Sequence, residues 1–218
     1  MMLRLFLLFV LLLPVSPAAA SETTVPATDG ALIEALKTAQ AGDTLRLSRG
    51  TYLGPIVIDK PLTLIGDGVT IDGQEVGSTI TVNAPDVTLR GLTVIGSGSG
   101  GGALDAGITL TKLADRAIID GNRILGNLIG IDVHGPNDAL VSGNIIEGRQ
   151  VARMNDRGNG IYVWNAPGTK VIGNDVRWGR DGVFVNTSKN NEFVGNRFRD
   201  LRFAVHYMYA NNSLVSGN

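Results

Sequence analysis

A Gly-Asn repeat with a period of about 22 residues constrains this chain more than any other feature of its sequence. The pairs recur along the second half, and three of the four steps between them are equal, from 121 to 143, 173 to 195 and 195 to 217. The remaining step, from 143 to 173, is one repeat plus an insertion. Repeats of this length are typical of stacked architectures, in which each unit buries its apolar face against its neighbours. The pairs are Gly121-Asn122, Gly143-Asn144, Gly173-Asn174, Gly195-Asn196 and Gly217-Asn218.

Apolar residues at fixed distances from each glycine give the register of the repeat. Ten and twelve residues after the glycine they alternate with other types, as in Ile131 and Val133 or Val183 and Val185. Alternation with a period of two predicts short strands with one buried face. Coils stacked about 4.8 Å apart would bury this apolar column continuously. The sequence therefore predicts an all-β fold, a right-handed parallel β-helix with about 22 residues per coil.

The asparagines of the Gly-Asn pairs should occupy one turn in successive coils. Stacked side-chain amides can donate and accept hydrogen bonds along the stacking axis, so this column is expected to be structural.

Upstream of the regular repeats, the pattern is weaker but continuous. A short amphipathic helix is expected first, with Asp29 as its N-cap and Leu32, Leu36 and Ala39 on one face. The first coil of a solenoid exposes its apolar column, so this helix is predicted to cap the N-terminal end. Strands of the first coils are expected over Tyr52 to Asp59, Leu62 to Ile65, Ile80 to Val82 and Val87 to Leu89.

Residues 1–20 have the features of a cleavable signal peptide. Arg4 supplies a positive charge, Leu5 to Leu13 form an apolar run, and Ala18-Ala19-Ala20 is a cleavage signal before Ser21. Residues 21–218 are then one exported β-helix domain, periplasmic in location. Because Asn218 falls inside a repeat, we expect this domain to be truncated at its C-terminal end.

Composition excludes several classes of function. The sequence has no cysteine, so thiolate metal sites and cysteine nucleophiles are excluded. The 19 basic and 20 acidic residues give a net charge of −1, which offers no electrostatic case for nucleic acid as a partner.

One predicted strand face carries side chains that could bind a ligand or a partner. Eleven and thirteen residues after each glycine, side chains should point outward, since those at ten and twelve point inward. Outward aromatics, histidines and a methionine in adjacent coils favour a partner or ligand surface over a solvated sheet. Aromatic stacking that only stabilises the sheet is the alternative interpretation. The outward positions hold Asp132, His134, Tyr162, Trp164, Phe184, Asn186, His206 and Met208.

His206 and Met208 form the strongest candidate for a metal site. Residues i and i+2 of a strand project from the same face about 6.5 Å apart. Imidazole together with thioether favours copper, particularly Cu(I). Met154, in an insertion over Gln150 to Asn159, is a candidate third ligand. His134 is three coils from Met208, about 14 Å away, and cannot join the same site.

A carbohydrate-active β-helix, such as a polysaccharide lyase, an epimerase or a carbohydrate-binding module, is the rival interpretation. Outward aromatics also stack on sugars. Lyases and epimerases need an acid/base pair, however, and the acidic residues fall into no column. Asp132 is the only carboxylate on the outward strand, while Asp115 and Asp181, next to arginines, are interpreted as solvated turn residues.

Three blocks of the sequence closely resemble the NosD family of periplasmic β-helix proteins. They are Gly158 to Asn165, Gly179 to Val185 and Leu201 to Tyr209. The resemblance implies a non-catalytic accessory role in the maturation of nitrous oxide reductase, through copper supply or copper-sulfur centre assembly. It further implies an ABC transporter with a permease and an ATPase, the reductase and a copper chaperone as partners. Attachment to the membrane would be peripheral, through the permease.

Overall fold

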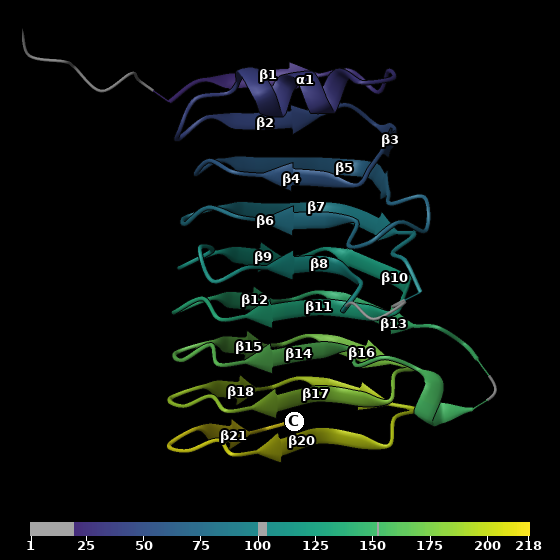
Figure 1. The fold of residues 1–218 in the computed structure, drawn as a ribbon, viewed down its shortest axis with the longest axis vertical. Coiled ribbons are helices and arrows are strands. Elements are labelled where there is room, and N and C mark those ends of the chain that lie inside the picture. Colours follow the sequence, from purple (N-terminus) through teal and green to yellow (C-terminus); the bar gives the residue numbers. More distant parts are fainter. Residues whose placement is uncertain (1–19, 100–103, 152) are drawn as a thin grey trace, which may run out of the picture.

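A computed structural model describes residues 20–99, 104–151 and 153–218, which form a parallel β-solenoid (Figure 1). Almost all of the predicted signal peptide therefore lies outside the described residues, and its cleavage stays a prediction. Successive coils pair strand on strand in parallel, and the pairing follows the repeat and its insertion, with Ile131 beside Ile161 and Ile161 beside Val183. The predicted fold class and repeat length are confirmed.

The elements are short, as the alternating pattern predicts. Their bounds are β1 Glu22–Val25, α1 Ala31–Thr38, β2 Thr44–Leu47, β3 Gly50–Leu53, β4 Ile56–Ile58, β5 Thr63–Asp72, β6 Ile80–Val82, β7 Thr88–Ile95, β8 Ala106–Leu110, β9 Ile118–Asp120, β10 Arg123–Asn127, β11 Ile129–His134, β12 Leu140–Ser142, β13 Ile145–Gly148, the 3-10 turn η1 Met154–Asp156, β14 Ile161–Trp164, β15 Lys170–Ile172, β16 Asp175–Arg177, β17 Asp181–Asn186, β18 Glu192–Val194, β19 Arg197–Arg199, β20 Phe203–Met208 and β21 Leu214–Ser216.

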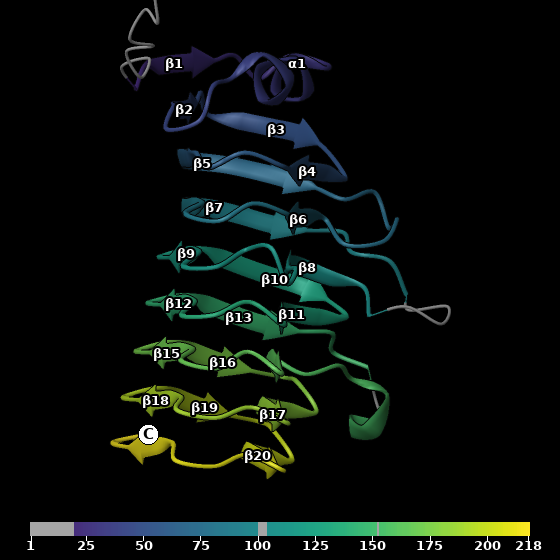
Figure 2. The same ribbon diagram turned by 60° about the vertical axis from the view of Figure 1, so that its left-hand side comes forward.

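The coils build three stacks of strands around one core. One stack is a seven-stranded sheet in the order β20-β17-β14-β11-β8-β6-β4, which we call the front sheet because it faces the viewer in Figure 1. The other two stacks, β9-β12-β15-β18-β21 and β10-β13-β16-β19, lie beside each other in Figure 2. They are joined through the longer strands β5 and β7, which contribute to both. The apolar column predicted from the repeat, including Ile131, Val163 and Val185, is buried between the stacks.

The asparagine column forms the predicted ladder. The side-chain amide of Asn144 donates to Oδ1 of Asn174 at 2.9 Å, and that of Asn174 donates to Oδ1 of Asn196 at 2.9 Å. Each amide also donates to a carbonyl of the preceding coil, as Asn174 does to Val141 at 3.0 Å. These buried amides are therefore satisfied by the fold itself, and the column is structural.

A glycine column fixes how closely the front sheet stacks on its neighbours. Gly130, Gly160 and Gly182 directly precede the first core residue of their strands. A Cβ on Gly160 would lie 2.3 Å from Cγ1 of Val176 and 2.8 Å from the carbonyl oxygen of Gly182. Side chains larger than hydrogen would push the coils apart, so these glycines set the register of the strands that carry the outward residues.

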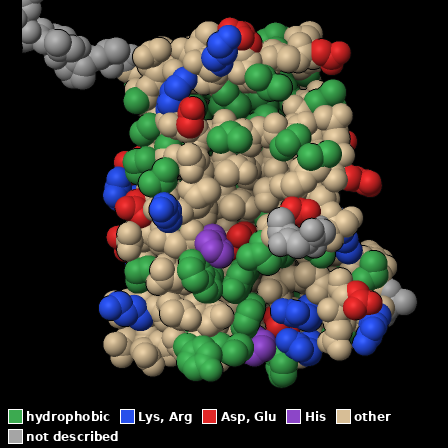
Figure 3. Space-filling view, in the orientation of Figure 1, with side chains coloured by type: hydrophobic (Ala, Val, Ile, Leu, Met, Phe, Trp, Pro, Cys, Tyr) green, Lys and Arg blue, Asp and Glu red, His purple; other side chains and the backbone are tan. Residues whose placement is uncertain are grey.

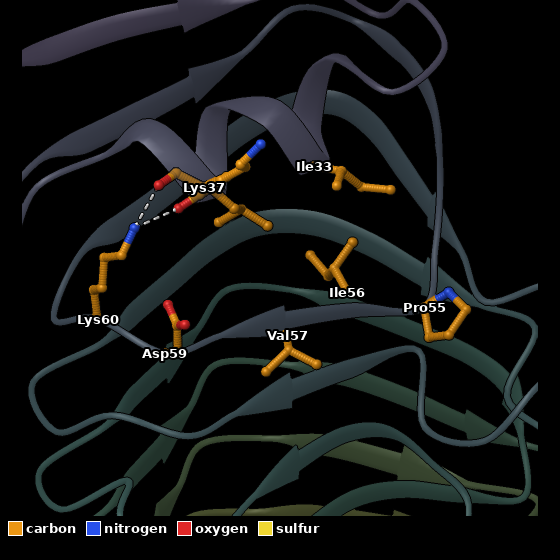
Figure 4. Close-up of a pocket in the computed structure, with 8 residues that line it drawn as sticks. Ile33, Lys37, Pro55, Ile56, Val57, Asp59 and Lys60 are labelled. Atoms are coloured by element: carbon orange, nitrogen blue, oxygen red, sulfur yellow. Dashed lines mark hydrogen bonds between the residues drawn. The ribbon is translucent and has the colours of Figure 1, made fainter.

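The helix α1 covers the N-terminal end of the solenoid, as predicted (Figure 1). Leu32, Leu36 and Ala39 are buried against the first coils. Nζ of Lys60 donates to the carbonyl oxygens of Leu36, Lys37 and Ala39 at 2.8–3.1 Å, which satisfies the C-terminal end of the helix. Figure 4 shows the bonds to Leu36 and Lys37. A depression of about 340 Å³ between this structural cap and the first coils is lined by residues of both, as Figure 4 shows.

Two local expectations were wrong. Asp29 is not the N-cap, because the N-cap position is held by Gly30, which has no side chain that could cap the helix. The expected strand over Tyr52 to Asp59 is two strands, β3 and β4, separated by Gly54-Pro55. Proline has no N–H for the strand ladder, so the chain turns a corner there. No helix among the described residues is long and apolar enough to cross a membrane.

Candidate functional site

The outward face of the front sheet carries the predicted surface residues in two rows. Strands β11, β14, β17 and β20 pair in register, so each residue lies beside its counterpart one coil on. Figure 3 shows both histidines of the chain on this face, with hydrophobic side chains between them. One row is Asp132, Tyr162, Phe184 and His206, and the other is His134, Trp164, Asn186 and Met208.

Aromatic rings contact one another along these rows. Tyr162 and Phe184 stack with ring centroids 5.2 Å apart, and Phe184 lies 4.7 Å from the His206 ring. In the other row, His134 stacks on Trp164 at 4.3 Å. The stacking interpretation is therefore part of the answer, because such contacts stabilise the sheet. Stacking does not explain why a ring nitrogen of each histidine lies beside a carboxylate.

His206 is held by a buried aspartate that the sequence interpretation placed in solvent. Asp181, the first residue of β17, has a fully buried side chain, so its assignment as a solvated turn residue was wrong. Its Oδ2 lies 3.0 Å from Nδ1 of His206. Arg202 donates from Nε to Oδ1 at 3.0 Å and from Nη2 to Oδ2 at 2.8 Å. The carboxylate is thus fixed on one side by a bidentate guanidinium and binds the imidazole on the other.

The charges around Asp181 keep it ionised. Burial alone would raise the pKa of this carboxyl, but the hydrogen bonds from Arg202 and His206 outweigh burial and lower the pKa. An ionised carboxylate accepts a hydrogen bond from Nδ1–H of His206, and that tautomer leaves the lone pair of Nε2 free. A carboxylate behind a histidine is the usual arrangement in which imidazole binds a metal ion.

The two predicted methionine ligands lie in different places. Met208 follows His206 by two residues on β20 and is half-buried on the same face. Met154 is exposed on the 3-10 turn, and the residues after it share a depression with Arg180, just before β17 begins. Met208 is the last residue of β20, at the opposite end of the front sheet, and Figures 1 and 2 both show the insertion on the side where these strands begin. The structure therefore does not bring Met154 to Met208.

Asp132 and His134 form a second arrangement on the same face. The Asp132 side chain is 3% exposed although it points outward, and its Oδ1 lies 3.6 Å from Nδ1 of His134. Burial raises the pKa of Asp132 to about 7 and lowers the pKa of His134. Both shifts favour the neutral forms, so burial opposes the ion pair that the residue types suggest.

Sequence reasoning missed Asp181 and Arg202 as functional partners. A signal was available, because Arg202 follows Asp181 after almost one period, which brings the two charges onto adjacent coils. Asn159 and Asp181 also hold equivalent places before a glycine in successive coils. The strand register pairs Asp181 with Phe203 and His206 with Phe184, so only the side-chain contact shows that His206 lies on the same carboxylate.

The two buried carboxylates of the front sheet, Asp132 and Asp181, lie far apart. In the strand register, Asp132 lies beside Tyr162 and then Phe184, whereas Asp181 lies three residues before Phe184. Two coil spacings and three residues along a strand separate them by roughly 14 Å. Carboxyl pairs that act on one glycosidic bond are at most about 9.5 Å apart.

Fold and surface together define a parallel β-helix protein that presents histidine, methionine and aromatic side chains on one sheet. Similar solved structures include an alginate lyase from Paenibacillus sp. strain FPU-7, with a TM-score of 0.55 and 19% identity, covering 83% of this chain and 75% of the lyase. A double mutant of the periplasmic alginate epimerase AlgG also has a TM-score of 0.55, with 12% identity over 88% of this chain and 54% of the epimerase. At these identities the likeness shows the fold alone.

Sequence similarity is more specific. Residues 142–218 match the family described as "Periplasmic copper-binding protein (NosD)". A probable ABC transporter binding protein NosD from Stutzerimonas stutzeri is 41% identical over 138 residues, and one from Pseudomonas aeruginosa is 37% identical over 137 residues. The alignments cover 63% and 62% of this chain. Over these residues the chain is similar to the NosD family, and it spans about a third (32%) of the length of these relatives.

Proposed function

We propose that this chain is a periplasmic, non-catalytic copper-handling protein in the maturation of nitrous oxide reductase. The observation that carries the proposal is the placement of His206, whose Nδ1 binds the buried Asp181 and whose Nε2 is left for a metal ion. Met208 supplies a thioether from the same face of the same strand. This combination favours Cu(I), and both residues lie in the segment that matches a family described as copper-binding.

Two protein ligands suit an ion that is passed on rather than stored. A His–Met pair leaves coordination positions of Cu(I) open, and a partner that donates or accepts copper can fill them. The adjoining rings of Tyr162, Trp164 and Phe184 would form the apolar contact surface for that partner. The printed names of the relatives support association with an ABC transporter. We assign its permease and ATPase, the reductase and a copper chaperone as partners, and peripheral membrane attachment through the permease.

The rival function, a carbohydrate-active enzyme, is not favoured by the two buried carboxylates of the front sheet. The separation of Asp132 from Asp181 supports this, because one bond cannot lie within reach of both. Cleavage or epimerisation of a uronan by the purified protein would reverse the assignment. Outward aromatics would then be sugar platforms instead of a partner surface.

Cu(I) titration against a competing chelator tests the copper site. We expect His206→Gln with Met208→Leu to lower Cu(I) affinity at least a hundredfold, since both ligands are lost. Beyond the predicted signal peptide, the chain contains one other histidine and one other methionine. His134→Gln and Met154→Leu are therefore matched controls, and both should retain wild-type affinity. Unchanged affinity in the double variant would remove this site from the proposal, and a loss with Met154→Leu would restore Met154 as a ligand.

A further inference from the structure

A groove opens on the front sheet above Asp132 and His134, away from His206. It has a volume of about 620 Å³ and lies over β8, β11 and β14. Most of the surface that lines it is apolar. The lining nevertheless includes the polar residues Thr109, Lys112 and Asn165, besides Trp164 and the Asp132–His134 pair. The proposed copper ligands lie at the other end of the two rows, so this groove has no part in the function proposed above.

Two polar atoms at this groove are buried without a partner. Oδ1 of Asp132 and Nδ1 of His134 are closed to solvent and have no hydrogen-bond partner among the described residues. They lie 3.6 Å apart, which is too long for a hydrogen bond between them. Buried polar groups in folded proteins are nearly always satisfied, so two such atoms facing each other indicate that something belongs between them.

We propose that Asp132 Oδ1 and His134 Nδ1 are the two protein ligands of a divalent transition-metal site beside this groove. Bonds of about 2.0–2.2 Å to carboxylate oxygen and imidazole nitrogen place two ligand atoms roughly 3–4 Å apart, and 3.6 Å falls in this range. Asp132 and His134 are residues i and i+2 of β11 and share one face. An ion at this place would take its remaining ligands from water or from a molecule in the groove, which Asp132 and His134 line.

The donor set selects ions different from those expected at His206 and Met208. One carboxylate oxygen and one imidazole nitrogen favour Cu(II) or Zn(II), whereas thioether with imidazole favours Cu(I). A positive ion also reverses the local electrostatics, because it favours the ionised carboxylate that burial disfavours. Metal binding at Asp132 and His134 therefore does not depend on copper binding at His206, and the two sites can be disproved separately.

A bridging water is a poorer occupant of the same place. Water oxygen lies about 2.8 Å from its hydrogen-bond partners, and neither atom is accessible to a water-sized sphere. A metal ion binds at shorter distances and satisfies both atoms at once. If the carboxyl instead stays protonated and empty, the experiment below shows no ion at this place.

Tryptophan fluorescence provides a local reporter for this site. The Trp164 ring lies 4.3 Å from the His134 ring, so bound Cu(II) should quench Trp164. The chain has two tryptophans, and the second, Trp178, contacts Arg177 elsewhere. Trp178→Phe therefore isolates the signal of Trp164. Chelator-treated protein of this background is titrated with Cu(II), and Zn(II) is then added as a competitor.

We expect one Cu(II) to quench Trp164 and Zn(II) to restore the emission. Asp132→Asn and His134→Gln should each weaken the affinity more than tenfold, while His206→Gln should leave it unchanged. Equal affinity in all three variants, or a loss confined to His206→Gln, would overturn the proposal.

A second measurement does not depend on how the Asp132 variant folds. Electron paramagnetic resonance of Cu(II) bound to His206→Gln should show coupling to one imidazole nitrogen, because His134 is then the only histidine left. A Cu(II) spectrum without nitrogen coupling in that variant would also overturn the proposal.

Discussion

The two histidines of the front sheet each lie beside a buried aspartate, yet the two pairs differ in charge. His206 meets Asp181, which Arg202 keeps ionised through two hydrogen bonds. His134 meets Asp132, which has no such partner and whose pKa burial raises to about 7. The first pair is complete within the protein and directs one imidazole nitrogen outward. The second pair is complete only when a cation is added.

The difference shows how strongly the neighbours of a histidine shape its chemistry. The two histidines lie in different rows of the same face, and each contacts an aromatic ring of the adjacent coil. Arg202 holds Asp181 in place, so that His206 is oriented as a ligand. Asp132 has no such arginine among the described residues, and its carboxylate stays unsatisfied. Exchanging or removing these neighbours should therefore alter the two pairs in opposite directions.

The largest expected effect is the pH dependence of stability caused by Asp132. Below its ordinary pKa of 3.8 the carboxyl is protonated in both states, and above that value only the unfolded chain releases the proton. The folded state keeps its proton up to about pH 7, so stability falls as pH rises from 4 to 7. Relative to Asp132→Asn, the metal-free protein should lose about 4 kcal/mol of unfolding free energy over that window.

Urea unfolding in a chelating buffer at several pH values measures this difference. Asp67→Asn is the matched control, because its carboxylate is 97% exposed and should show no such slope. A flat difference between wild type and Asp132→Asn would mean that Asp132 is solvated or paired in solution.

The next largest effect should be a loss of stability at pH 7, whereas Asp132→Asn should increase stability at that pH. Asp181→Asn leaves Arg202 without its carboxylate, and we expect a loss of about 3 kcal/mol of unfolding free energy at pH 7. Cu(I) affinity should also fall at least tenfold, because the orientation of His206 is lost. Adding Arg202→Met to Asp181→Asn should recover part of the stability but none of the affinity. Equal stability of Asp181→Asn and wild type would contradict the ionised, buried pair.

The smallest effect should come from the ring between the two pairs. Phe184→Leu removes the stack on Tyr162 and His206 and should cost about 1 kcal/mol of unfolding free energy. Cu(I) affinity at His206 should fall slightly, and Cu(II) quenching of Trp164 should not change, because the His134–Trp164 stack does not include Phe184. A comparable loss at both sites would show that the two rows act as one unit.

Much of the fold was predictable because the spacing of the repeat determines which residues form turns and which pack in the core. Gly-Asn pairs at a constant spacing require a turn and an amide ladder, and alternating aliphatics require strands around one core. The register that follows correctly placed the eight outward residues in two rows. The N-cap and the strand break at Pro55 were missed because they depend on local backbone geometry outside the repeat.

The sequence by itself determined the solenoid, its period and the residues that face outward, because each follows from spacing along the chain. Tertiary structure alone decided what those residues can do. Asp181 and Arg202 meet His206 only because adjacent coils stack in register, and Asp132 is buried only because its neighbours cover it. Burial and charge pairing belong to the assembled sheet, so no linear pattern could show that the pKa of Asp181 is lowered while that of Asp132 is raised to about 7.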